Sequence, residues 1–196
     1  MNLKKLPRSF YTRPTLTVAR DLLGKIFVRR HGNGLLSGRI VEVEGYLGKR
    51  DPASHAYRGR TPRNQVMFRV GGYLYVYFTY GMHFCANVVT EEEGKGRAVL
   101  LRAVEPLEGM RSMVRSRGIA ATEGRNLCNG PAKLCQAFRM GWKENGTDLC
   151  GTSIWIAEDA DAPPLKNIGR SPRIGISSAT HHRWRFFLVD SSFLSR

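Results

Sequence analysis

Two carboxylates stand two residues apart in the segment GRIVEVEGYLG, residues 38–48. The segment has the alternation of a strand, which predicts that Glu42, Glu44 and Ile40 share one face while Val41 and Val43 share the other. The two acidic Cα atoms would be about 7 Å apart, close enough for each carboxyl group to influence the ionisation of the other. Such a pair can supply the carboxylate that takes a proton from an attacking water in a hydrolytic site. The spacing does not choose between Glu42 and Glu44, and a solvated strand face explains the pair equally well.

Other side chains suited to catalysis or binding lie in the segment after these carboxylates and in a second predicted strand. The segment 48–64 is too rich in Gly, Pro, Arg and Asp for regular structure and predicts a long loop, which contains Asp51, Ala53 and His55. Arg102 interrupts the apolar strand AVLLRAV, residues 98–104. A buried arginine needs an anionic partner, so we expect these groups to converge with the carboxylates at one end of a sheet.

A hairpin with an aromatic tip is predicted from the alternating run GYLYVYFTYGMHFCANV, at residues 72–90. Tyr46 and Tyr77 could form two walls that stack a planar ring, an interaction worth about 1–3 kcal/mol per base. Tyr80 precedes the turn glycine, where a small polar residue is usual. A large flat side chain at this position could enter a nucleic-acid duplex as a wedge and fill the space left by a displaced nucleotide.

The charge of the chain favours a polyanionic partner. Its 196 residues include 31 basic and 16 acidic ones, for a formal net charge of +15, and nucleic acid is the leading candidate. Arg58, Arg60 and Arg63 in the long loop, and Lys133 in the first turn of a helix predicted from NGPAKL, are placed to meet backbone phosphates. A solvated loop and a surface lysine are the alternatives.

The remaining pattern predicts a single α+β domain, residues 1–196, with a largely antiparallel sheet. A helix should begin at Pro14 and stop at Gly24, and a second should run over 107–117 with Met110, Met113 and Val114 inward. A third should follow the cap Asn129-Gly130 over 131–138. Further strands are expected at 25–30, 36–44, 152–157, 173–176 and 185–189.

The cysteines and the hydropathy suggest neither a metal site nor a membrane span. Cys85, Cys128, Cys135 and Cys150 have no zinc-finger spacing, and buried free thiols are expected. His181-His182 is only a weak metal signal. The chain has no 18-residue apolar run and no apolar leader after its first residues, so we expect an intracellular protein, in the cytoplasm or nucleoid if bacterial, with no membrane partner.

Five motifs, in this order, resemble the alkyladenine DNA glycosylase family, also called 3-methyladenine or methylpurine DNA glycosylases. They are GRIVEVEGYLG, HxxRGRTPRN, GYLYVYFTYGMHFCANV, VLLRAVEPLEGM and NGPAKLCQAF, and the similarity extends over roughly residues 8–190. The resemblance implies a monofunctional base-excision enzyme that flips a damaged purine out of duplex DNA and hydrolyses its N-glycosidic bond. It implies a curved antiparallel sheet like the barrel-like domain of methionyl-tRNA formyltransferase, surrounding helices and a protruding hairpin, a monomer, and no metal or organic cofactor.

The resemblance also assigns roles to residues. Glu44 would be the general base, and Arg102 would help to position the site around the water. The base pocket would be formed by Tyr46, His55 and Tyr77 together with backbone at Ala53 and at Ile174-Gly175, with Asn87 shaping its entrance. Tyr80 with Met82 would be the intercalating tip. The expected substrates are alkylated or deaminated purines of the 3-methyladenine, 7-methylguanine, hypoxanthine and ethenoadenine class.

Two other functions remain compatible with the residues alone. A nucleic-acid-binding protein without catalysis could use the basic surface and the tyrosines as a platform for single strands or RNA. A structural or ribosome-associated basic protein would keep Glu44 and Arg102 as an ordinary buried ion pair.

Overall fold

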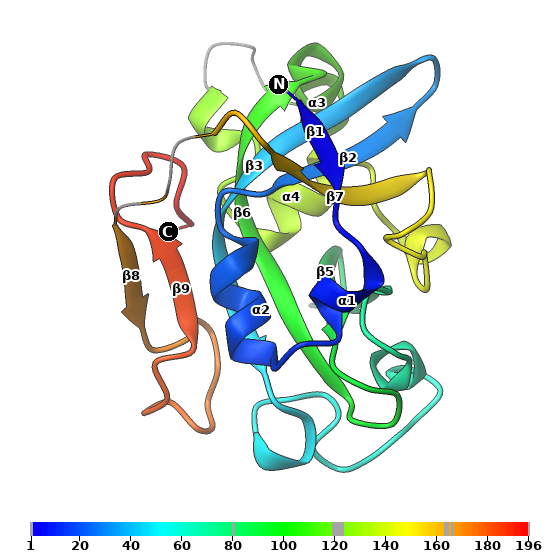
Figure 1. Ribbon diagram of the computed structural model, residues 1–196, viewed down its shortest axis with the longest axis vertical. Helices are drawn as coiled ribbons and strands as arrows, with labels where there is room; N and C mark the ends of the chain where they lie inside the picture. The colour runs from blue at the N-terminus through cyan, green and yellow to red at the C-terminus, as the bar shows by residue number, and fades with distance from the viewer. Residues whose placement is uncertain (1, 80, 119–123, 163–164, 166, 196) are drawn as a thin grey trace.

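A curled antiparallel sheet forms the body of the molecule in the computed structural model, which describes residues 2–79, 81–118, 124–162, 165 and 167–195 (Figure 1). All of its strand pairs are antiparallel, and its main path runs in the order β1-β7-β2-β3-β6-β5-β4. The strands on this path are β1 (Leu3–Lys5), β7 (Ile154–Asp159), β2 (Ile26–His31), β3 (Gly34–Tyr46), β6 (Arg97–Glu108), β5 (His83–Thr90) and β4 (Leu74–Thr79). The predicted α+β class, with one domain built around a curved antiparallel sheet, is confirmed.

A branch of the sheet brings the C-terminal part of the chain to β3. The hairpin of β8 (Ile168–Ser171) and β9 (Arg185–Leu188) pairs through β9 with residues 42–44 of β3, beyond the end of the β2 pairing. β3 is therefore flanked by β6 along one side and by β2 and then β9 along the other. This arrangement places residues near positions 42 and 190 side by side.

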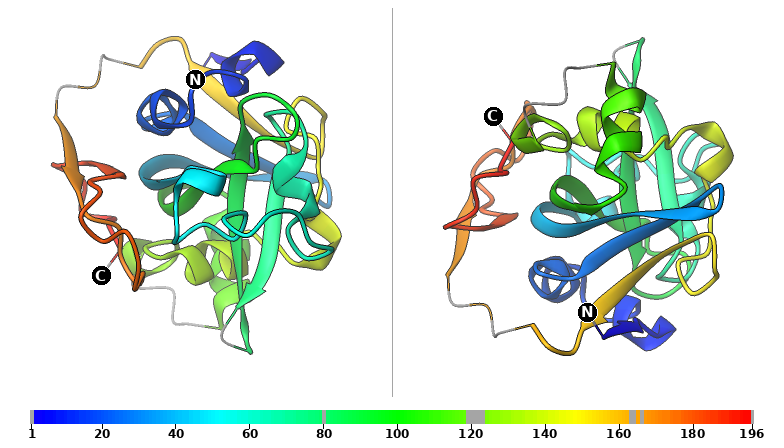
Figure 2. Two further views of the ribbon diagram at one scale, coloured as in Figure 1. Left: turned by 90° about the horizontal axis from the view of Figure 1, so that it is seen from below. Right: turned by 90° about the horizontal axis from the view of Figure 1, so that it is seen from above.

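Helices cover both sides of the sheet: α1 (Arg8–Tyr11), α2 (Thr15–Leu22), α3 (Met110–Arg117) and α4 (Pro131–Ala137). Figure 2 shows α1 and α2 on one side and α3 and α4 on the other. α2 starts directly after Pro14 and its chain reverses at Gly24, whose φ of +77° is a conformation that glycine adopts without strain. Short 3-10 turns lie in the connections, at Gly48–Arg50, Gln65–Phe68, Gly124–Asn126 and Trp142–Glu144.

The β4–β5 hairpin presents two different faces, as its alternation predicts. Leu74 and Val76 belong to the main hydrophobic core, whereas Tyr75 and Tyr77 pack with a second, smaller cluster formed with the loop after β3. The hairpin is paired as far as Thr79 and His83, and Gly81 has a φ of +67°. Tyr80, the predicted wedge, lies outside the described residues.

A β-bulge in β3 makes the predicted face of Ile40 wrong. The register against β6 shifts between Ile40 and Glu42 and again between Glu42 and Val43. Ile40 and Val43 consequently both lie in the main core, because an extra residue in one strand reverses the alternation. Glu42 and Glu44 still share a face, since both carboxylates contact the guanidinium of Arg102.

One predicted strand is not formed, and one predicted helix begins later than expected. The strand expected at 173–176 is instead irregular chain that follows β8, which ends at Ser171 before Pro172. The helix expected from residue 107 begins at Met110, because β6 continues through Glu108 and the chain turns at Gly109 with a φ of +78°. In this helix Met113 is buried, but Met110 is exposed rather than inward.

Candidate active site

A cavity of about 330 Å³ opens between the loop after β3, the β4–β5 hairpin and the irregular chain after β8. The residues that the sequence predicted for a pocket, and Arg102 with them, all line it: Tyr46, Ala53, His55, Tyr77, Asn87, Arg102, Ile174 and Gly175. The lining also includes residues for which the sequence predicts no pocket role: Met67, Tyr75, Thr79, Cys85, Leu100, Pro131 and Ile176. The volume is in the range of small-molecule binding pockets.

Three rings form one wall of the cavity. The rings of Tyr75 and Tyr77 stack with centroids 5.4 Å apart, and His55 meets Tyr77 edge-on at 4.4 Å. His55 Nδ1 lies 3.1 Å from the Tyr75 hydroxyl. Partial burial, and then repulsion from Arg63, lower the pKa of His55, so the imidazole is neutral at neutral pH. Burial raises the pKa of the Tyr75 hydroxyl to about 12, which keeps it protonated.

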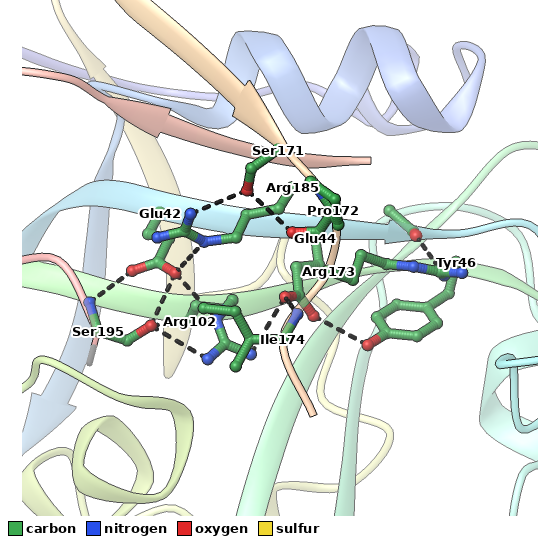
Figure 3. A network of polar contacts seen from close by, with 11 residues as sticks. Glu42, Glu44, Tyr46, Arg102, Ser171, Pro172, Arg173, Ile174, Arg185 and Ser195 are labelled. Atoms are coloured by element: carbon green, nitrogen blue, oxygen red, sulfur yellow. Dashed lines mark hydrogen bonds and ion pairs between the residues drawn. The ribbon is translucent and has the colours of Figure 1, made fainter. Parts of the chain in front are cut away.

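The Glu44 carboxylate is fully buried, and its partners Tyr46, Arg102 and Ile174 line the cavity; Figure 3 shows this network. The hydroxyl of Tyr46 donates to Oε2 at 2.9 Å, and the backbone N–H of Ile174 donates to Oε1 at 2.8 Å. Arg102 Nη1 forms an ion pair with Oε1 at 3.2 Å. Burial, followed by the charge of Glu44, raises the pKa of the Tyr46 hydroxyl well above its usual range, so that it remains a donor.

Glu42 lies behind Arg102 and is more fully paired. Its Oε1 accepts from Arg185 Nε at 2.7 Å and from Arg102 Nε at 2.9 Å, and Ser195 donates to both carboxylate oxygens. Burial alone would raise the pKa of this carboxyl group, but these bonds outweigh it and the pKa of Glu42 lies below its usual value. The buried centre thus holds two carboxylates and two guanidinium groups, which balance in charge.

A second ion pair supports Tyr46 from behind. Arg173 donates to both oxygens of Asp51, at 2.5 and 2.8 Å, and to the carbonyl oxygen of Gly45 at 3.0 Å. Its guanidinium lies between two rings, 4.6 Å from the centroid of Tyr46 and 5.0 Å from that of Trp184. Both members of the ion pair have fully buried side chains. This pair joins the loop after β3 to the chain after β8, and both segments line the cavity.

The positions predicted for contact with a duplex are mostly at the surface. Arg58 and Arg60 are exposed, and Arg63 donates to the carbonyl oxygen of Phe78 beside the hairpin. Met82, next to the tip, has 68 % of its surface exposed. Lys133 donates to the side chain of Asn129 at 2.8 Å. The N-cap residue of α4 is Gly130, and no side chain among the described residues, including that of Asn129, makes a capping hydrogen bond.

Sequence reasoning brought Arg102 together with the carboxylates, as the structure does, but missed the other partners of the charged groups. Arg173, Arg185 and Ser195 are separated from the acids that they contact by 122, 143 and 153 residues. Asp51 had been expected near the site, but nothing in its surroundings along the chain indicated Arg173. The cysteines are unpaired; Cys85, Cys128 and Cys135 are buried as predicted, whereas Cys150 is only partly buried.

The comparisons with known proteins identify the family of the chain. The sequence profile of the family described as methylpurine-DNA glycosylase (MPG) matches residues 9–192. A protein of Chlorobaculum tepidum is 49 % identical over 195 residues, covering 99 % of this chain and 92 % of the relative. One of Desulfitobacterium hafniense is 44 % identical over 203 residues, covering 98 % and 99 %. Both relatives carry the provisional name 3-methyladenine DNA glycosylase.

The fold, the site and these relatives define the class of the protein as a hydrolase that acts on N-glycosyl bonds, a DNA glycosylase of base excision repair. Within that class, the chain belongs to the methylpurine-DNA glycosylase family. DNA is therefore its substrate, and the protein takes part in the repair of alkylation damage.

Two other kinds of feature are absent from the part of the chain that the structure describes. No helix there is long and apolar enough to cross a membrane. The described residues also contain no group of three or more His, Cys, Asp or Glu side chains arranged to hold a metal ion.

Proposed function

We propose that this protein extrudes an alkylated or deaminated purine from duplex DNA into the cavity and hydrolyses its N-glycosidic bond with a water activated by Glu44. The substrate class is 3-methyladenine, 7-methylguanine, hypoxanthine and ethenoadenine, and the product is an abasic site. The observation that carries the proposal is the position of Glu44, a buried carboxylate whose partners Tyr46, Arg102 and Ile174 all line one cavity.

The hydrogen bonds of the two carboxylates support Glu44 rather than Glu42 as the base. A carboxylate has about four lone-pair sites. Among the described residues, Glu44 meets three donors, two at Oε1 and one at Oε2, so one of its roughly four sites remains for water. Glu42 meets four donors: Arg102, Arg185 and the Ser195 hydroxyl at Oε1, and the Ser195 N–H at Oε2. It also lies on the far side of Arg102, and its lowered pKa makes it a poor proton acceptor.

The reaction needs charge stabilisation as well as a base. As the bond to the purine breaks, positive charge develops on the sugar carbon, and the ionised Glu44 carboxylate stabilises that charge while it takes a proton from the water. Alkylated purines carry positive charge and leave readily, so extrusion and water placement are the main tasks for them. Neutral lesions such as hypoxanthine are poorer leaving groups and depend more on contacts to the departing base.

The aromatic wall supplies binding of the extruded base. Tyr46 and Tyr77 both line the cavity, and stacking on such rings is worth about 1–3 kcal/mol per base. The neutral His55 offers a hydrogen-bond partner, and Asn87 lies in the lining beside β6. Tyr80 and the exposed Met82 would enter the duplex as the wedge, with Arg58, Arg60, Arg63 and Lys133 near the phosphates. The protein would act as a monomer.

The test is a single-turnover excision assay on duplexes with one hypoxanthine or one ethenoadenine, run beside alkylated DNA. Glu44→Gln keeps the size of the side chain and should abolish release of base while it preserves lesion binding. Glu158→Gln, in an exposed pair with Lys25, is the matched control and should excise like the wild type. Near-normal release by Glu44→Gln would refute the mechanism. Tight duplex binding without release of base from any substrate would indicate a binding protein with a glycosylase fold.

A further inference from the structure

A residue of the C-terminal segment closes the network behind the cavity. Ser195 is buried, and its Oγ accepts from Arg102 Nη2 at 3.0 Å and from Nε at 3.2 Å. The same hydroxyl donates to Glu42 Oε1 at 2.7 Å, and the Ser195 backbone N–H donates to Oε2 at 2.6 Å. Figure 3 shows Arg102 between Ser195 and Glu44.

We propose that Ser195 is a positioning residue that fixes the guanidinium of Arg102 and, through it, the orientation of Glu44. The inference rests on the proposed role of Glu44 as the base. A guanidinium is a rigid planar fork, so holding the edge formed by Nε and Nη2 determines where Nη1 points. Here that edge is held by Ser195 and Glu42, and Nη1 is directed to Glu44 Oε1.

Loss of the hydroxyl affects Arg102 more than it affects the fold. Without Oγ, Nη2 has no other acceptor among the described residues, and an unpaired buried donor is unfavourable. The guanidinium then keeps only its contacts with Glu42 and Glu44 among the described residues, and its Nε–Nη2 edge is held less firmly. Glu42 itself stays paired with Arg185 and with the Ser195 backbone N–H, and the pairing of β9 with β3 does not involve the hydroxyl.

The expected effect is therefore on the chemical step rather than on binding. A misplacement of about 1 Å near reacting groups can reduce a rate by about a hundredfold. In Ser195→Ala, Arg102 keeps its contacts with Glu42 and Glu44, so we expect a smaller loss of rate, about tenfold. A tenfold loss corresponds to about 1.4 kcal/mol in the barrier. The affinity for lesion DNA should not change, because Ser195 has no contact with the stacking rings and Tyr46 meets this network only through its hydroxyl, which donates to Glu44.

The experiment compares Ser195→Ala, Ser195→Thr and Ser192→Ala with the wild type. Single-turnover excision at saturating protein measures the rate, fluorescence anisotropy measures the affinity for lesion duplex, and all assays run well below the melting midpoint of the least stable variant. Ser192 is exposed in the same segment and serves as the matched control. We expect Ser195→Ala to lose about tenfold in rate at unchanged affinity, while the Thr variant, which keeps the hydroxyl, retains most of the rate. An unchanged rate in Ser195→Ala, or an equal loss in both Ser195 variants, would overturn the proposal.

A double-mutant cycle separates positioning from a general structural effect. If Ser195 acts through Arg102, Ser195→Ala should cause no further loss of rate in an Arg102→Gln background. The same loss in both backgrounds would overturn the proposal. Failure of the proposed function is a different result: the wild type itself would release no base, or Glu44→Gln would be as active as the wild type.

Discussion

The ion pair of Asp51 and Arg173 is predicted to be the most sensitive polar contact around the cavity. Asp51→Asn removes the negative charge with little change of shape. Both side chains are fully buried, with two N–O contacts of 2.5 and 2.8 Å. Removing one partner of such a pair typically lowers the free energy of unfolding by about 3–5 kcal/mol, because the other charge stays buried without compensation. The whole free energy of unfolding of a small domain is about 5–15 kcal/mol, so Asp51→Asn should lose a large part of it.

Urea unfolding followed by far-ultraviolet circular dichroism measures this change. The control is Glu92→Gln, whose pair with Lys95 is exposed, with an N–O distance of 3.7 Å, and this variant should unfold like the wild type. Asp51→Asn should also weaken lesion binding, because Arg173 packs on the ring of Tyr46. The double variant Asp51→Asn, Arg173→Met should lose less than the sum of the single losses, since it leaves no unpaired charge. A loss below about 1 kcal/mol for Asp51→Asn, the range of an exposed pair, would refute this reasoning.

Two further predictions concern pH and salt. The pKa of Glu42 lies below its ordinary value of 4.5, so this group stabilises the fold above that pH and loses its contribution as the pH falls through the folded-state pKa. Glu42→Gln should therefore unfold more easily at neutral pH and lose less stability on acidification, and parallel pH profiles in urea titrations would contradict this. Lesion-duplex binding should weaken steeply with salt, and Arg58→Gln with Arg60→Gln should reduce the slope of log K against log salt by about 0.9 for each phosphate that is no longer neutralised. An unchanged slope would mean that Arg58 and Arg60 do not neutralise DNA phosphates.

Local patterns in the sequence predicted those elements that depend on neighbouring residues. Pro14 and Gly24 delimit α2, and the alternation with Gly81 predicts the hairpin with its tyrosine face. These features follow from restricted backbone angles and from side-chain periodicity, which act over a few residues. The bulge after Ile40 was not predicted, because a shift of register depends on how the partner strand packs.

The sequence by itself determined the chemical groups of the site. It contained the two carboxylates of β3, the arginine within an apolar strand and the tyrosines, and its motifs indicated the family. Only the tertiary structure decided how the contacts of these groups differ: Glu44 contacts residues that line the cavity, while Glu42 lies behind Arg102 with Arg185 and Ser195. It also decided that Asp51 pairs with Arg173. The physical reason is that a buried charge needs partners within a few ångströms in space. Here the strand order of the sheet brings those partners from more than a hundred residues away along the chain.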